Sequence, residues 1–116
     1  MRVLFIDDRK RDIERLINLS GINREHQVET EIFTGLDTCL QAVQGFEPEI
    51  VFIGHGLSAY PLTGSDVIRH LRSAGVVTKF IANSGGGAIL FENDGVEVDG
   101  SANRCPGKIT ALLAQE

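Results

Sequence analysis

The chain has 116 residues, of which 42% are hydrophobic and 23% charged, a composition typical of one soluble globular domain covering residues 1–116. Its formal net charge of −5 argues against a nucleic-acid partner, because that affinity depends on clustered Lys and Arg that neutralise phosphates. No apolar run is long enough to cross a bilayer, and an acid as early as Asp7 does not fit a signal peptide. We therefore expect a cytoplasmic protein with no membrane contact.

The first third of the chain predicts two strands around a helix. Residues 2–6 form a continuous apolar run after Arg2, which indicates a buried strand. Residues 9–19 place their apolar side chains on one helical face, and Ser20-Gly21 predicts the end of that helix. Residues 27–33 alternate between polar and apolar types, as a half-buried strand near the sheet edge does.

A second helix and a second buried strand follow. Thr34 predicts an N-cap, and the apolar periodicity runs to Gln44, with Gly45 as the predicted stop. The run Ile50–Ile53 has no polar alternation and consists of β-branched and aromatic residues. Such a run is typical of the middle of a parallel sheet that helices cover on both faces.

The last half of the chain repeats the alternation. Residues 60–64 read as a loop, and Ser65 predicts the cap of a helix that ends at Ser73-Ala74-Gly75. A strand is predicted over residues 76–82, a short helix over 88–91 and a short fifth strand over 96–98. Pro106 suits the first turn of the final helix. Strands that alternate with helices in this way predict an α/β fold with a doubly wound, five-stranded parallel sheet and helices on both faces.

Three stretches of this sequence resemble the receiver domain of two-component response regulators. They are Val3-Leu4-Phe5-Ile6-Asp7-Asp8, Pro48-Glu49-Ile50-Val51-Phe52-Ile53, and the segment from Leu62-Thr63-Gly64 to Arg72. The resemblance implies a flavodoxin-like three-layer sandwich over the whole chain. It further implies a magnesium-binding acid pair after the first strand and a phosphoacceptor aspartate after the third. A Ser or Thr after the fourth strand and a Lys-Pro step after the fifth would contact the phosphoryl group.

Carried onto this sequence, the resemblance keeps some of these groups and loses others. The acid pair is Asp7 and Asp8, and the hydroxyl is Ser84. The phosphoacceptor position falls on Gly54, which has no side chain. The lysine position falls on Cys105, with Arg104 and Lys108 as imperfect neighbours. Asp7 and Asp8 either hold a weakly bound Mg²⁺ or only complement the dipole of the first helix; no other cofactor is expected.

His55 allows two interpretations. A narrower branch of receiver-like domains, thought to process small phosphates, ends the third strand in acid-His-acid-Leu, which here reads Gly54-His55-Gly56-Leu57. A histidine beside Asp7 and Asp8 could serve as a general base, phosphoryl acceptor or metal ligand. The preferred interpretation is that its side chain points into the next helix.

Glycines at two strand ends raise the question of an anion site. Together with Ser84, Gly85 and Gly86 could cradle a phosphate with their backbone N–H groups, or they could simply permit a turn. Bare backbone at Gly54 and Gly56 adds to the same predicted cleft at the carboxyl ends of the strands.

The sequence therefore predicts a non-enzymatic, receiver-like signalling domain that acts on another signalling protein, a kinase or an output protein, independently of phosphorylation. The alternative is a domain that binds or processes small phosphates through Asp7, Asp8, His55 and Ser84. A DNA-binding regulator is disfavoured because no output domain follows the last helix.

Overall fold

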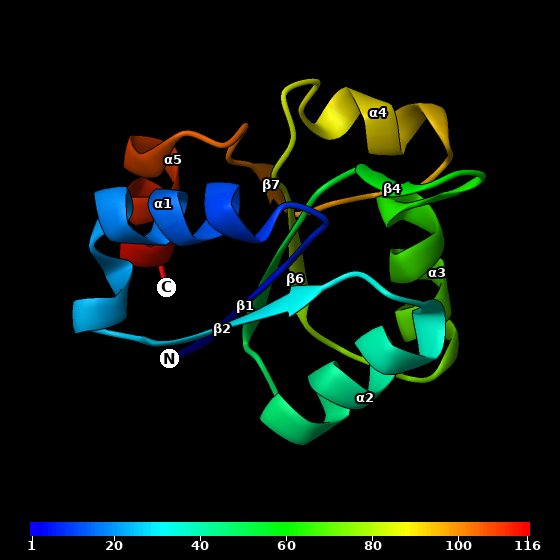
Figure 1. The fold of residues 1–116 in the computed structure, drawn as a ribbon, viewed down its shortest axis with the longest axis horizontal. Helices are drawn as coiled ribbons and strands as arrows, with labels where there is room; N and C mark the ends of the chain where they lie inside the picture. The colour runs from blue at the N-terminus through cyan, green and yellow to red at the C-terminus, as the bar shows by residue number, and fades with distance from the viewer.

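The two continuous apolar runs form the centre of a parallel sheet in the computed structural model, which describes all residues from Met1 to Glu116. Strand β1 (Arg2–Asp7) pairs with β3 (Ile50–Ile53), and β2 (Gln27–Ile32) lies at the outer side of β1. Strands β6 (Lys79–Ala82) and β7 (Gly100–Ser101) complete the order β2-β1-β3-β6-β7 (Figure 1). This order is that of flavodoxin-like doubly wound sheets, so the predicted fold class is confirmed.

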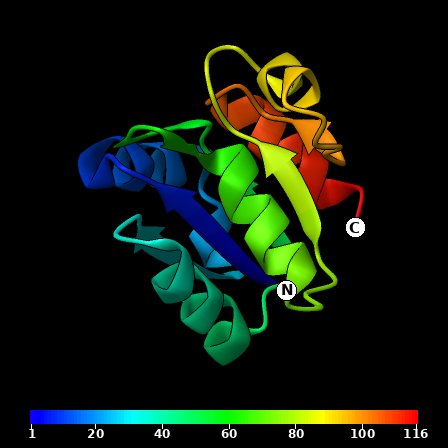
Figure 2. The same cartoon turned by 90° about the vertical axis from the view of Figure 1, so that its right-hand side faces the viewer.

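Helices cover both faces of the sheet (Figures 1 and 2). Helices α1 (Lys10–Ser20) and α5 (Pro106–Ala114) pack on one face, and α2 (Leu36–Phe46), α3 (Gly64–Ser73) and α4 (Ala88–Asn93) pack on the other. A single 3₁₀ turn, η1 (Ile22–Arg24), follows α1. The side chains of β3 are buried on both faces, as its unbroken apolar run requires. No helix combines the length and the apolar character that crossing a membrane requires.

The ends of the first two helices differ in how well the sequence predicted them. Gly21 ends α1 as expected, with a φ of 70° and an N–H that donates to the carbonyl of Ile17. In α2, however, the N-cap is Gly35 rather than Thr34, and the predicted stop, Gly45, lies inside the helix. Glu47 ends α2 instead, because it adopts a left-handed conformation and its N–H donates to the Val43 carbonyl.

The predicted loop before the third helix is a β-hairpin. Strands β4 (Gly56–Ala59) and β5 (Leu62–Thr63) pair antiparallel, with a cis peptide bond at Tyr60-Pro61 between them. The cap of α3 is Thr63 rather than Ser65, since the carboxylate of Asp66 accepts a hydrogen bond of 2.8 Å from the Thr63 N–H. This reciprocal arrangement is a capping box.

The last two sheet strands are shorter than predicted. The segment before Lys79 is not part of β6, because the Val76 N–H bonds the carbonyl of Leu71 at the end of α3. The predicted strand over 96–98 is displaced to β7. The Val96 N–H donates to the Phe91 carbonyl at the end of α4, and pairing with β6 starts only where the Asp99 N–H reaches the Phe80 carbonyl.

Candidate functional site

The acid pair lies at the carboxyl end of β1, where strand order reverses between β1 and β3 and where doubly wound folds bind their ligands. Asp7 is the last residue of the strand and is only 1% exposed. Its Oδ1 accepts a hydrogen bond of 2.8 Å from the Asp8 N–H and lies 3.5 Å from the Arg104 guanidinium. Asp7 is thus held inward by the backbone N–H of Asp8 and by one cation.

Gly54, the first residue after β3, lies directly against Asp7. Its N–H donates to the Ile6 carbonyl, which extends the pairing of β3 with β1. A Cβ atom placed on Gly54 would lie 2.9 Å from Oδ2 of Asp7. The Asp7 carboxylate therefore occupies space that a side chain at position 54 would need. The φ of Gly54 is not in the left-handed region, so the backbone itself does not require glycine here.

The two carboxyls are electrostatically unequal. Burial raises the pKa of Asp7 from 3.8 to about 6; its side-chain hydrogen bond with Asp8 adds to this, and the Asp8 N–H and Arg104 oppose it. Partial burial also disfavours the Asp8 carboxylate, but hydrogen bonds from Asp7 and Ser58 outweigh it and lower the pKa of Asp8. Below about pH 6 the pair therefore carries its negative charge chiefly on Asp8, the more accessible member, whereas at neutral pH both carboxyls are ionised.

Ser58 joins this site, although no sequence pattern predicted it there. It lies on β4 with a φ of 55°, and its hydroxyl donates to Oδ2 of Asp8. Left-handed backbone is unfavourable for a residue other than glycine and is found where surrounding structure enforces it. Only the unexpected hairpin brings this serine back to the end of β1.

Asn83 and Ser84 follow β6 and bring further polar groups to the same sheet edge. Oδ1 of Asn83 accepts a hydrogen bond of 2.9 Å from the Arg104 N–H, whereas Nδ2 of Asn83 and the Ser84 hydroxyl have no protein partner. The other two buried polar side-chain atoms without a partner are Asp7 Oδ2 and Asp8 Oδ1. Unpaired buried polar groups are costly, so their concentration at this edge marks it as a candidate binding site.

Arg104 supplies the cation next to the acid pair, and Cys105 does not. Asn103 and Arg104 both adopt left-handed conformations, with φ of 51° and 56°. This strained step turns the Arg104 guanidinium toward Asp7, while Cys105 becomes the N-cap of α5. The sequence identified Arg104 only as an imperfect neighbour of the lysine position.

His55 contacts α4 rather than the acid pair. Its Nε2 lies 2.7 Å from Oδ2 of Asp94, and its ring meets Phe91 edge-on with centroids 5.1 Å apart. The Ser65 hydroxyl donates to the same Asp94 oxygen at 2.7 Å. The ring is thus turned away from the acid pair, but toward α4 rather than toward α3, the next helix in the chain.

The glycines after β6 have mixed roles. Gly85 is exposed, and a Cβ there would touch nothing within 4 Å. A Cβ on Gly86 would lie 2.5 Å from the side chain of Leu90, so any side chain at this position requires that leucine to move.

A divalent cation would find two ligands at this edge, Oδ2 of Asp7 and Oδ1 of Asp8. No group of three His, Cys, Asp or Glu side chains is placed to hold a metal ion. Two carboxylates with water completing the shell are compatible with weak Mg²⁺ binding.

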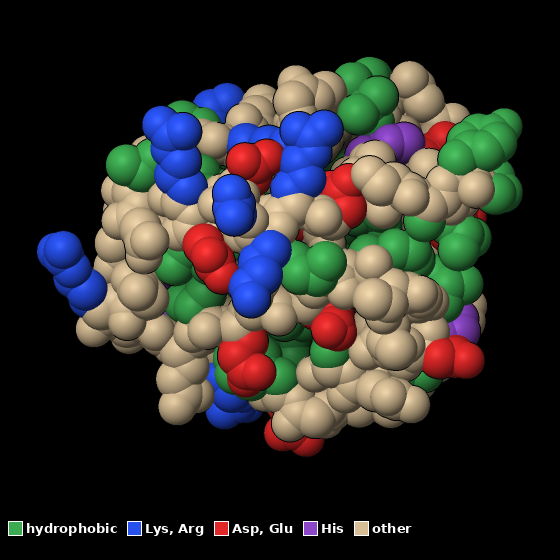
Figure 3. Space-filling model, viewed as in Figure 1, with side chains coloured by type: hydrophobic (Ala, Val, Ile, Leu, Met, Phe, Trp, Pro, Cys, Tyr) green, Lys and Arg blue, Asp and Glu red, His purple; other side chains and the backbone are tan.

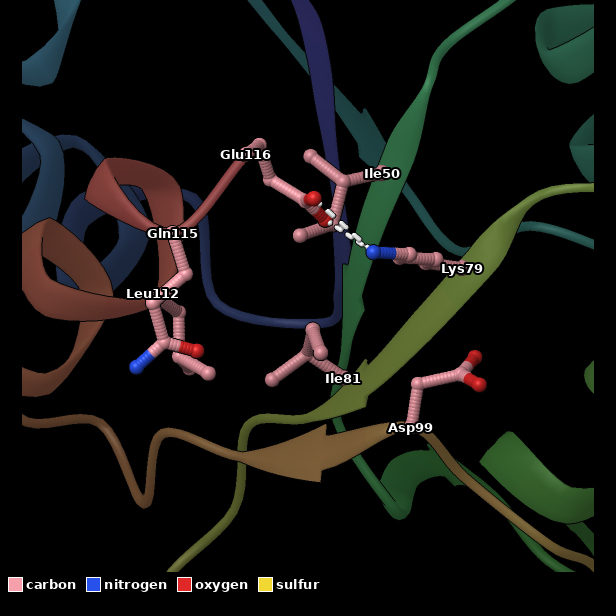
Figure 4. A pocket seen from close by; sticks show the side chains of 7 residues that line it. All are labelled: Ile50, Lys79, Ile81, Asp99, Leu112, Gln115 and Glu116. Carbon is pink, nitrogen blue, oxygen red and sulfur yellow. Dashed lines mark hydrogen bonds and ion pairs between the residues drawn. The ribbon is translucent and has the colours of Figure 1, made fainter.

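A separate hollow of about 260 Å³ lies at the opposite end of the sheet (Figure 4). Apolar side chains of Ile50, Ile81 and Leu112 form part of its wall. The Lys79 ammonium crosses it to the Glu116 carboxylate at 2.7 Å. None of the predicted site residues lines it.

Comparisons with known proteins place the chain by its fold. No protein-family model matches the sequence, and no curated protein matches it. The structure is similar to the response regulator receiver domain (CheY-like) from Methylobacillus flagellatus, with a TM-score of 0.73, 19% identity, and coverage of 99% of this chain and 97% of that one. It is also similar to chemotaxis protein CheY4 from Vibrio cholerae, with a TM-score of 0.75, 16% identity, and coverage of 98% and 96%. A third similar structure is a two-component response regulator of the LuxR family from Aurantimonas sp. SI85-9A1, with a TM-score of 0.68 and 20% identity. The match covers 99% of this chain and 86% of that one. The chain has the receiver fold.

Proposed function

We propose that this chain is a receiver-like signalling domain that acts through protein–protein contacts and is not switched by phosphorylation of an aspartate after β3. The observation that carries the proposal is Gly54. It lies where the receiver resemblance puts the phosphoacceptor, directly against Asp7, and offers no oxygen. Phosphoryl transfer to protein needs a nucleophilic side chain at the reacting position.

The charge arrangement supports the same function. An acceptor carboxylate at position 54 would compete with the Asp7 carboxylate for the same space. Arg104 already lies 3.5 Å from Asp7, so part of the charge that a bound cation would neutralise is balanced within the chain. The partner is then another protein of the signalling system, a kinase or an output protein.

A second candidate function is non-covalent binding of a small phosphate. The unpartnered donors of Asn83 and Ser84, at the same sheet edge as the unpartnered oxygens of Asp7 and Asp8, favour it. A cation bound to the two carboxylates and an oxyanion bound to the two donors would give all four unpartnered atoms a partner. His55 has no part in this version because Asp94 holds its ring.

Phosphodonor treatment tests the main proposal. The protein is incubated with acetyl phosphate and Mg²⁺, and its intact mass is measured before and after. We expect no phosphoryl adduct, since position 54 has no nucleophile. An adduct that maps to residues 54–57 would refute phosphorylation independence. Calorimetric titration with inorganic phosphate in the presence of Mg²⁺ decides the second candidate, which requires measurable binding heat.

A further inference from the structure

β2 is the longer of the two edge strands of the sheet, and its outer side is open. It has six residues and pairs only with β1, whereas β7 at the other edge has two residues. Figure 1 shows β2 in the foreground between α1 and α2, with no other segment drawn in front of it. An uncovered edge strand offers a row of backbone N–H and C=O groups with which another strand can pair.

The register of β2 identifies the backbone groups that point outward. The N–H groups of Gln27 and Phe33 both donate to carbonyls of the segment that forms β1. Along a strand, successive residues turn their N–H and C=O groups to opposite sides. The groups that point away from the sheet therefore belong to Val28, Thr30 and Ile32. None of the backbone hydrogen bonds of turns, loops or caps reaches these three residues.

A groove of about 320 Å³ lies beside this edge, between β2 and α2. Glu29 and Glu31 of β2 are the only charged residues that line it, and neither takes part in a salt bridge. They lie on the same face of the strand, because side chains alternate between the two faces of a sheet. Figure 3, drawn in the view of Figure 1, shows acidic side chains over the region of β2. A ligand that enters this groove meets two negative charges that the chain does not balance.

The wall of the groove on α2 leaves room for long side chains. Ala42 and Gly45 line it, and a Cβ atom on Gly45 would touch nothing within 4 Å. The φ of Gly45 is not in the left-handed region, so neither its backbone nor its packing requires glycine. Glycine is also less favourable than alanine within a helix. What the glycine does provide is an open side of the groove next to the edge of β2.

The two acids select the occupant of this edge. A second copy of the chain that paired through β2 would bring its own Glu29 and Glu31 to the same face, and like charges on neighbouring strands destabilise their pairing. Charged side chains on an edge strand are a common protection against such self-association. A strand with Lys or Arg at alternate positions is attracted instead, because its basic side chains face the groove. Its remaining positions lie on the α1 side, where Val28 packs against the core, and suit aliphatic residues.

We propose that the open edge of β2 binds an extended segment of a partner protein in which basic and aliphatic residues alternate, so that this segment adds a strand to the five-stranded sheet. Backbone hydrogen bonds to Val28, Thr30 and Ile32 supply the affinity, and the acids of the groove supply the selectivity, as is general for strand addition. This proposal rests on the proposed function, for which it names a contact surface and the chemistry of the partner.

Hydrogen exchange with synthetic peptides tests the proposal. The ¹⁵N-labelled protein is mixed with a peptide of alternating valine and lysine, or with one of alternating valine and glutamate, and the exchange of individual amides is measured. We expect the lysine peptide to slow exchange at Val28, Thr30 and Ile32, whose N–H groups it pairs. Exchange at Glu29 and Glu31 should change little, because their backbone already faces β1. The glutamate peptide should protect none of these amides.

Methylation of the peptide nitrogens separates strand pairing from charge attraction. Two further lysine peptides carry N-methyl groups, one on every valine and the other on every lysine. Only one of these two sets of nitrogens faces β2 in a paired strand, so one peptide should lose the protection of the outward amides and the other should retain it. Equal behaviour of the two methylated peptides would overturn the proposal.

Three variants locate the contact. Glu29→Lys should weaken binding of the lysine peptide roughly tenfold, because it turns an attraction between neighbouring strands into a repulsion. Glu97→Lys is the matched control: it changes the net charge equally at an exposed acid just before β7, at the other edge of the sheet, and should have little effect. Gly45→Leu fills the groove and should weaken binding without lowering the melting temperature, since a side chain there meets no other group.

Several results contradict strand addition at β2. They are equal weakening by the two charge reversals, unchanged binding to the Gly45 variant, protection confined to other elements, and no protection at all. Protection of the outward amides that rises with protein concentration in the absence of peptide would show that a second copy occupies the edge, and would also overturn the proposal. Because phosphodonor treatment is a separate experiment, such a failure leaves the proposed function standing.

Discussion

At the scale of single residues, Gly54 and Asp7 determine each other's environment. The missing side chain at position 54 leaves room for the Asp7 carboxylate, which becomes 1% exposed. Burial then raises the pKa of Asp7 to about 6. The native state therefore binds the Asp7 proton at pH values where the unfolded chain, with a pKa near 3.8, has released it.

This difference fixes the sign of a pH effect. Between pH 3.8 and about 6, the folded protein holds more protons on Asp7 than the unfolded chain does, so this group's contribution to stability falls as the pH rises. The lowered pKa of Asp8 acts in the opposite direction, and its stabilising contribution is lost only as the pH falls through that lowered value. The pH range in which Asp7 changes the stability lies above the range in which Asp8 does.

Gly54→Ala should reduce the loss of stability that Asp7 causes as the pH rises. The added Cβ would lie 2.9 Å from Asp7 Oδ2, so the carboxylate has to move toward solvent and its pKa should fall. Urea unfolding of both proteins between pH 3.8 and 6 should then show a smaller loss of stability with rising pH in the variant, by about 1–3 kcal/mol. A carbon-13 titration of the Asp7 carboxyl provides the direct check. An unchanged Asp7 pKa in the variant would show that position 54 does not control this carboxyl.

The sequence predicted part of this site for a simple reason. Acids that directly follow a buried apolar run lie at a strand end, and so Asp7 and Asp8 could be located without a structure. Ser58 could not, because its approach to Asp8 depends on a hairpin and a left-handed φ that no local pattern encodes. Arg104 was named only as a neighbour, since two consecutive left-handed residues decide which side chain faces Asp7.

At the scale of elements, the hydrophobic periodicity predicted the strands and helices whose side chains pack into the core. β3 is buried over its full length and α1 buries one face, so both follow from side-chain pattern alone. β7 does not, because the apolar Val96 is used to close α4 rather than to build a strand. Thr63, rather than Ser65, begins α3 for a similar reason: the Ser65 hydroxyl is committed to Asp94.

The contact between His55 and Asp94 should hold α4 to the end of β3. α4 has only six residues, too few for a helix that is stable without tertiary contacts. His55→Ala should therefore speed amide hydrogen exchange in α4 and leave α1 and α5 unchanged.

His70→Ala is the matched control for this exchange experiment. His70 also contacts an acid, with Nε2 at 3.1 Å from Asp37, but this pair links α3 to α2 and its acid is largely exposed. Faster exchange of α4 amides in the His70 variant, or none in the His55 variant, would show that the His55 contact does not anchor the helix.

At the scale of the whole molecule, two helical layers meet at the strand ends around one acidic site. The connection from β7 to α5 contributes Arg104, and the hairpin before α3 contributes Ser58. The site is therefore assembled from both layers of the receiver fold, although one position after β3 contributes only backbone. We propose that two positions distinguish this chain from a phosphorylated receiver: Cys105, which replaces the lysine, and above all Gly54, which replaces the acceptor acid.

Restoring an acid there tests this claim most directly. Gly54→Asp adds a third carboxylate beside Asp7 and Asp8, which should repel one another without metal and together bind Mg²⁺ more tightly than two do. Thermal melts of wild type, Gly54→Ala and Gly54→Asp are compared in chelator and in Mg²⁺, with the alanine variant as the control for bulk. We predict that the aspartate variant is the least stable in chelator and that Mg²⁺ raises its melting temperature most, by mass action on the folded state. A Mg²⁺-induced rise no larger than that of the other two proteins would contradict the placement of Gly54 at the missing acid position.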